Sequence, residues 1–125
     1  MAREPEELVA MRRALGAQLA VCRQAAGLAQ GQLARAAFCD RSTVAHIEKG
    51  RSRGAERFWT VADECCGANG VLLAGFQAWV AAMQDHEVRI REEQLAQARA
   101  KVESLRAASA PQLPRAAGSS GTVGE

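Results

Sequence analysis

The sequence predicts an all-α protein. Apolar residues recur at helical spacing along most of the 125 residues, and the alternating pattern of a strand is rare. The composition is rich in alanine and arginine, contains no tyrosine and is sparse in valine and isoleucine. A chain of this length is expected to form one domain with a short additional segment.

The first predicted helix covers Leu8–Ala26. Its apolar face consists of Leu8, Met11, Leu15, Leu19 and Cys22. Gly27 follows directly, where a left-handed residue commonly ends a helix. A second, short helix is predicted over Gln30–Ala37, with Leu33 and Ala34 buried.

The third predicted helix covers Arg41–Lys49, with Asp40 as a candidate N-cap and Gly50 at its end. A basic loop at 51–54 leads to a fourth helix over Ala55–Cys66. The apolar residues of this fourth helix are Phe58, Val61, Ala62 and Cys65. Two short helices joined by a tight turn, the second followed by glycine and basic residues, are typical of a helix-turn-helix.

A long fifth helix is predicted over Val71–Ala108. Its first part is expected to complete the core with Leu72, Leu73, Phe76, Trp79, Val80 and Met83. Its second part is charged and carries apolar residues at heptad spacing, namely Val88, Leu95, Ala98, Val102 and Leu105. One heptad position, near Arg91 or Glu92, is not apolar. This pattern is compatible with a dimeric coiled coil and with a helix folded back on its own domain.

The chain divides into three predicted segments. Residues 1–83 form the domain, residues 84–108 the extended helix, and residues 109–125, rich in proline, glycine and serine, a disordered tail. The charged N-terminus does not resemble a targeting segment, and the longest apolar stretch, Val71–Met83, is too short to span a bilayer. We therefore expect a cytoplasmic protein that does not bind a membrane.

The net charge of +2 is unevenly distributed. Residues 8–54 contain eight basic and two acidic side chains, whereas residues 55–108 contain six basic and eight acidic ones. A basic first half suits a protein that presents one face to a polyanion such as nucleic acid.

The four cysteines, Cys22, Cys39, Cys65 and Cys66, follow no metal-ligand spacing, so neither a metal nor another cofactor is expected. We interpret them as free thiols, with Cys39 as an oxidation sensor only if its thiolate is exposed and its pKa is low. Asp63 and Glu64 are adjacent on one helix and do not face each other. Because the sequence contains no nucleophile–base set, phosphate-binding loop or metal cluster, an enzyme is not expected.

The segment Arg41–Lys49 contains the residue types that a reader of the major groove needs. A helix that enters the groove presents its first turn to base edges, where side chains must be short or form hydrogen bonds. The candidate base-reading residues are Arg41, Ser42, Thr43 and His46, with Val44 and Ile47 on the opposite, buried face. The candidate phosphate-binding residues are Gln30, Lys49, Arg51 and Arg53.

The segment LAVCRQAAGLAQGQLARAAFCDRSTVAHIEKGRSR resembles the helix-turn-helix of the Cro/phage-repressor (xenobiotic-response-element, XRE) family. It is most similar to the actinobacterial branch, and the resemblance covers residues 15–79. The matching residues are Arg23, Gly27, Leu28, Gln30, Leu33, Ala34, Ser42, Thr43, Val44, Ile47, Glu48, Gly50 and Arg51.

This resemblance implies a five-helix, repressor-like domain in which Arg23 pairs with Glu48 and Gly50 is a left-handed C-cap. It also implies base contacts by Arg41, Ser42 and His46, and phosphate contacts by Gln30, Lys49 and Arg51. The pair of Arg23 and Glu48 would set the angle of the recognition helix, which is the predicted helix Arg41–Lys49. Breaking the pair would leave a partly buried charge without its partner.

Three positions depart from the family pattern. Ala29 stands where members usually carry the Ser or Thr that caps the second helix, a loss of about 1 kcal/mol. Phe38 replaces the glycine usual in the turn, so we expect the turn to be strained or rebuilt. Gly54 and Ala55 replace the proline that is common after the basic loop.

The sequence therefore predicts a sequence-specific transcriptional regulator that binds double-stranded DNA. A homodimer is expected because one short recognition helix reads only a few base pairs. The alternative is an interaction adaptor or antitoxin-like protein that keeps the fold and binds a protein partner through its C-terminal helix. The changes at Ala29 and Phe38 and the heptad pattern motivate that alternative.

Overall fold

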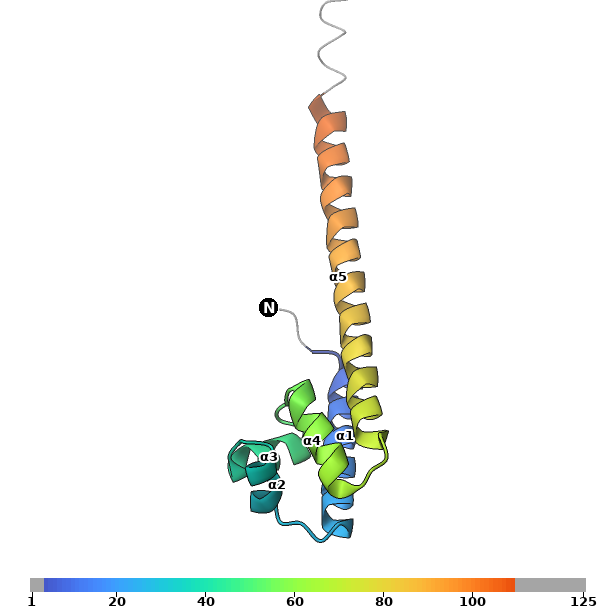
Figure 1. The fold of residues 1–125 in the computed structure, drawn as a ribbon. Helices are drawn as coiled ribbons and strands as arrows, with labels where there is room; N and C mark the ends of the chain where they lie inside the picture. Colours follow the sequence, from blue (N-terminus) through green and yellow to red (C-terminus); the bar gives the residue numbers. More distant parts are fainter. Residues whose placement is uncertain (1–3, 110–125) are drawn as a thin grey trace, which may run out of the picture. The chain divides into compact units, whose positions relative to one another are not determined.

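The computed structural model describes residues 4–109, which form five α-helices and no strand (Figure 1). The helices are α1 (Glu6–Ala25), α2 (Gln30–Ala36), α3 (Arg41–Glu48), α4 (Glu56–Cys66) and α5 (Val71–Ser109). The predicted all-α class and the order of the five helices are confirmed. The segment predicted to be disordered lies outside the described residues, except Ser109, which is the last residue of α5.

The chain divides into two compact units, with the boundary between Asp85 and His86. The first unit contains α1 to α4 and the beginning of α5, and the second contains the rest of α5. None of the described helices is long and apolar enough to cross a membrane.

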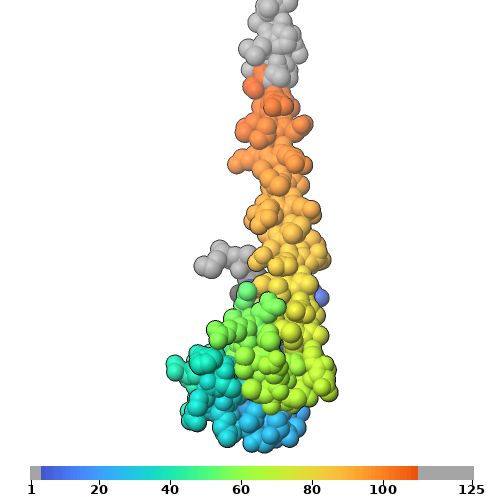
Figure 2. Space-filling model, viewed as in Figure 1, coloured from blue at the N-terminus to red at the C-terminus, as the bar shows by residue number. Residues whose placement is uncertain are grey.

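The first unit is built around one apolar core. Its buried residues are Leu8, Leu15, Leu19, Leu33, Ala34, Val44, Ile47, Phe58, Trp59, Ala62, Leu72, Phe76 and Trp79. The indole Nε1 of Trp59 donates to the carbonyl oxygen of Arg53 at 2.8 Å, and that of Trp79 donates to Leu8 at 3.1 Å. Both tryptophans can therefore be buried without leaving an indole N–H group unpaired. At the surface of this unit the cyan α2 adjoins the green α4 (Figure 2).

The buried face of α4 differs from the predicted one. Phe58 and Ala62 are buried as predicted, but Cys65 is exposed and Trp59 is buried. The reason is the packing against α5, where the ring of Trp59 stacks on Phe76 with centroids 5.9 Å apart. Burial of the Trp59–Phe76 ring pair favours the orientation of α4 that turns Trp59 toward the core over one that would bury the thiol of Cys65.

Asp63, also on α4, is buried and organises the start of α5. Its carboxylate accepts hydrogen bonds from the backbone N–H groups of Gly70 and Leu73, at 2.7 and 3.0 Å. Burial alone would raise the pKa of Asp63, but these backbone donors outweigh it and hold the pKa below its usual value. From the sequence we considered Asp63 only as one of a pair of catalytic carboxylates with Glu64 and did not predict this structural role.

Candidate nucleic-acid interface

The turn between α2 and α3 keeps a regular geometry without a glycine. Phe38 adopts a φ of 56°, in the left-handed region. The N–H groups of Phe38 and Cys39 donate to the carbonyl oxygens of Arg35 and Ala34, at 3.3 and 2.9 Å. This pair of bonds is the Schellman pattern that ends many helices. The turn is therefore not rebuilt, and Phe38 itself adopts a conformation that costs about 1–2 kcal/mol for a non-glycine residue.

The first turns of α2 and α3 have no side-chain cap. Ala29 has no polar side chain, but its N–H group donates to Oε1 of Gln32 at 2.7 Å, so half of a capping box remains. Asp40 occupies the predicted N-cap position of α3 with an extended backbone, yet its carboxylate forms no capping hydrogen bond. Asp40 is therefore the N-cap residue of α3 by position, as predicted, but its side chain does not cap the helix.

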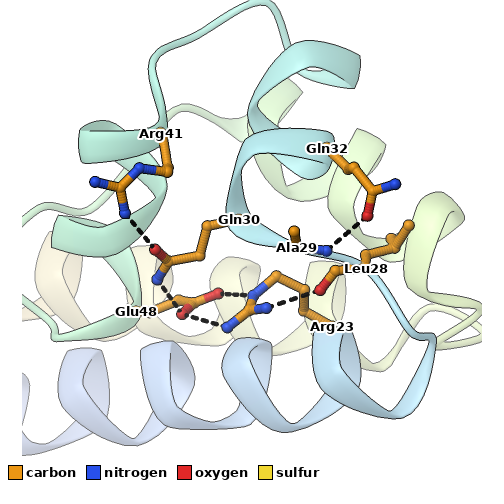
Figure 3. A network of polar contacts seen from close by, with 7 residues as sticks. All are labelled: Arg23, Leu28, Ala29, Gln30, Gln32, Arg41 and Glu48. Atoms are coloured by element: carbon orange, nitrogen blue, oxygen red, sulfur yellow. Dashed lines mark hydrogen bonds and ion pairs between the residues drawn. The ribbon is translucent and has the colours of Figure 1, made fainter.

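An ion pair between Arg23 and Glu48 joins α1 to the last residue of α3 (Figure 3). The guanidinium donates from Nε to Oε2 at 2.5 Å and from Nη2 to Oε1 at 3.1 Å. The two side chains are only 10% and 7% exposed, and Nη1 of Arg23 donates to Leu28 O at 2.8 Å. The hydrogen bonds to Glu48 raise the pKa of Arg23 in spite of its burial. The pair implied by the family resemblance is thus present, and it fixes the end of α3.

Gln30 extends this network to the first residue of α3 (Figure 3). Its Nε2 donates to Oε1 of Glu48 at 2.9 Å, and its Oε1 accepts from Nη1 of Arg41 at 3.2 Å. Both ends of the amide are therefore engaged inside the protein. The sequence assigned Gln30 to a phosphate and Arg41 to a base, and it did not predict that the two side chains touch.

Two residues of α1 that the sequence did not single out also position α3. A Cβ atom on Gly16 would lie 2.3 Å from the carbonyl oxygen of Ile47, so only glycine allows this close approach of α1. Nε of Arg12 donates to the carbonyl oxygen of Gly50 at 2.7 Å. The sequence signal for this contact was a glycine within an amphipathic helix, but the sequence does not show which helix packs against Gly16.

The predicted contact residues fall into two groups. The exposed ones on or just after α3 are Arg41, Ser42, His46, Lys49 and Arg51. Thr43 is half-buried and lines a hollow together with Ala37 and Phe58. Arg53 is exposed, but its guanidinium carbon lies 5.6 Å from the ring centroid of Trp79. Thr43, because it is half-buried, and Arg53, because its guanidinium lies against Trp79, form the second group.

Cys39 does not meet the requirement for an oxidation sensor. Burial raises the pKa of its thiol, and the charge of Asp40 raises it further. A raised pKa keeps the sulfur protonated, and the protonated thiol is the less reactive form. Among residues 4–109 no cluster of His, Cys, Asp or Glu is suited to hold a metal ion.

The geometry defines the class of protein. A short helix, α2, braces a second helix across a four-residue turn at 37–40, and the second helix is anchored at its end and exposed at its first turn. This arrangement is a helix-turn-helix, a DNA-binding unit. The sequence pattern of the helix-turn-helix domain family matches residues 14–76, just over half of the chain, and the chain belongs to this family. Comparisons with curated proteins and with solved structures return no match.

Proposed function

We propose that the chain is a sequence-specific transcriptional regulator of the Cro/phage-repressor (XRE) type. In this proposal α3 enters the major groove of double-stranded DNA. The observation that supports it is the contrast between the two sides of α3: Arg41, Ser42 and His46 are exposed, whereas Val44 and Ile47 are buried. A helix held rigidly on one side and polar on the other is what groove recognition requires.

Arg41 is the proposed main reader of base sequence. A guanidinium can donate two parallel hydrogen bonds to O6 and N7 of guanine, a contact that discriminates by about 1–3 kcal/mol. The bond to Gln30 restricts the conformations of Arg41 and so favours one direction of approach. Ser42 and His46 provide further base contacts, and half-buried Thr43 lies at the margin of this set.

The proposed phosphate contacts come from the ends of both helices. Lys49 and Arg51 follow α3 on the exposed surface, and Gln30 opens α2. The amide of Gln30 bonds to Glu48 and Arg41, so its contact with a phosphate would use the second N–H of Nε2. Arg53 belongs to the same basic loop, although it also stacks on Trp79. Such contacts set the affinity and orientation on DNA without reading its sequence.

A homodimer is part of the proposal. The eight residues of α3 form a helix of about 12 Å, which spans only a few base pairs. Two copies would read two half-sites and so recognise a longer sequence. The extension at 84–108 is the proposed self-association segment, and the cytoplasm, where DNA is accessible, is the proposed location.

The test is binding-site selection with the purified chain, followed by titration of the selected duplex. Arg41→Ala is expected to relax base preference, whereas Lys49→Ala should weaken binding to all duplexes and lower the salt slope by about 1. Arg35→Ala, an exposed arginine near the end of α2, is the matched control and should change neither property. Absence of any salt-sensitive binding to duplex DNA would contradict the proposal.

A second candidate function is an adaptor that binds a protein partner through its C-terminal helix. The observation that favours it is the exposure of Val88, Leu95, Val102 and Leu105 on α5. A partner retained after Arg41 and Lys49 are both replaced by alanine would support the adaptor. Loss of that partner in the same double variant would count against it.

A further inference from the structure

The second unit carries an exposed apolar stripe on α5. Val88, Leu95, Val102 and Leu105 are 46%, 50%, 51% and 63% exposed. In the seven-residue repeat of a coiled coil, the a positions are Val88, Leu95 and Val102, and the d positions are Arg91, Ala98 and Leu105. We call these six residues the seam.

We propose that the seam pairs with the seam of a second copy of the chain, and that the two helices run antiparallel. Each a residue then faces a d residue of the second copy: Val88 faces Leu105, Arg91 faces Val102, and Leu95 faces Ala98. A parallel pair would instead place each seam residue opposite its own equivalent. This inference rests on the self-association in the proposed function but not on its DNA binding.

The size of the side chains favours the antiparallel pair. Ala98 lies in a hollow on the surface of α5 that is also lined by Leu95 and Val102. Antiparallel pairing brings Leu95 of the second copy to this hollow, and symmetry repeats the contact. Parallel pairing would set Ala98 against Ala98 and leave a void, which loses contacts on both sides.

The charged residue in the seam points to the same orientation. A parallel pair would bring Arg91 face to face with Arg91 of the second copy inside an apolar layer. The antiparallel pair separates the two arginines by about 16 Å along the axis, at the rise of a helix. Each Arg91 then faces Val102, so its aliphatic stem can cover that side chain while the guanidinium reaches solvent.

The residues that flank the seam also discriminate between the two orientations. A parallel pair brings Glu87 against Glu92 and repeats this repulsion by symmetry. It likewise brings Lys101 against Arg106. An antiparallel pair instead brings Glu92 against Arg99 of the second copy, twice. These residues are all exposed on α5, so they are free to make such contacts.

Charge reversal gives opposite outcomes for the two orientations. In the antiparallel pair, Glu92→Arg faces Arg99 and should raise the dimer Kd roughly tenfold or more at low salt. The double variant Glu92→Arg/Arg99→Glu restores opposite charges and should recover the wild-type Kd. In a parallel pair, Glu92→Arg faces Glu87 and would tighten the dimer. Sedimentation equilibrium of the full chain without DNA measures the Kd, and circular dichroism checks that helicity is unchanged.

Cross-linking tests the orientation directly. A tagged chain with Val88→Cys is mixed with a chain carrying Leu105→Cys and oxidised mildly, with the wild type as the baseline for the four native thiols. We expect a disulfide-linked heterodimer of the two variants. A Val88→Cys homodimer, or a wild-type chain that stays monomeric at all concentrations, would overturn the inference. A monomer that still binds its DNA site would overturn this inference and the proposed homodimer but leave the proposed DNA binding standing. A dimer that binds no DNA would overturn the proposed DNA binding and leave this inference standing.

Discussion

The turns that follow α2 and α3 have the same backbone but opposite tolerance for side chains. Phe38 has a φ of 56° and Gly50 a φ of 75°, and both residues take part in the same pattern of hydrogen bonds that ends a helix. Phe38 is 81% exposed, whereas Gly50 is buried. A Cβ atom on Gly50 would lie 2.6 Å from Cγ and 2.8 Å from Cα of Arg13.

The comparison separates two reasons for glycine at the end of a helix. A left-handed backbone costs a non-glycine residue about 1–2 kcal/mol, which a folded domain can tolerate. Close packing against another backbone leaves no room for a side chain at all. The first reason applies to both turns and the second only to Gly50, so only the turn after α3 requires glycine. The end of α3 is also where Arg12, Arg23 and Gly16 hold the helix.

The largest effect is expected for Gly50→Ala, which attacks the packed turn. Backbone strain and the contact with Arg13 together should lower the free energy of unfolding by about 3–4 kcal/mol. The matched control is Gly27→Ala, since Gly27 has a φ of +74° with nothing within 4 Å of its Cβ position. Urea denaturation should show a loss of about 1–2 kcal/mol for Gly27→Ala, the cost of the backbone alone. Equal losses in the two variants would contradict the comparison.

Glu48→Ala breaks the anchor beside the packed turn. It leaves the buried guanidinium of Arg23 without its carboxylate, and we expect a loss of about 3 kcal/mol in the free energy of unfolding. Glu64→Ala, on the exposed surface of α4, is the control and should change stability by less than about 0.5 kcal/mol. Thermal denaturation of both variants measures the difference. A Glu48→Ala domain as stable as the control would show that the pair does not anchor α3.

Phe38→Gly tests the exposed turn in the opposite direction. It removes the backbone strain but also the contact of the ring with the guanidinium of Arg57, 5.4 Å from the ring centroid. The net result should be a gain of about 0.5–1 kcal/mol. Phe38→Ala keeps the strain and loses the ring, so it should not be stabilising. A loss of stability in Phe38→Gly would show that the ring, rather than the backbone, decides this turn.

An effect as small as that of Phe38→Gly is expected at the other end of α2. Ala29→Ser supplies a hydroxyl at an N-cap whose backbone is already extended, with a φ of −80° and a ψ of 157°. Stability should rise by about 0.5–1 kcal/mol, measured by urea denaturation. Ala25→Ser, at an exposed position near the end of α1, should not be stabilising. Together with Phe38→Gly, this variant tests whether substitutions on the exposed side of the helix-turn-helix can raise its free energy of unfolding.

The order and approximate limits of all five helices could be predicted from the sequence. Apolar spacing, together with glycines such as Gly27 and Gly50, marks where helices run and where they end, because these signals act over a single turn. The exposure of Arg41 and the burial of Val44 follow from the same spacing on α3. These features depend on residues close to one another in the chain.

Other features depend on residues that are distant in the sequence. The indole of Trp59 is buried because α5 brings Phe76 against it, and Gly16 is required because the carbonyl groups of α3 lie on α1. The connection of Arg41 through Gln30 to Glu48 likewise exists only once three helices have met. No pattern of neighbouring residues in the sequence indicates these contacts between distant residues.

The sequence by itself determined the all-α class, the helix-turn-helix and the basic residues that follow its second helix. Only the tertiary structure decided that Phe38 keeps the turn in its regular form, that Gly50 has no room for a side chain, and that Gln30 holds Arg41. The physical reason is that periodicity and turn residues encode local conformation. The cost of a side chain depends on what the rest of the fold places beside it.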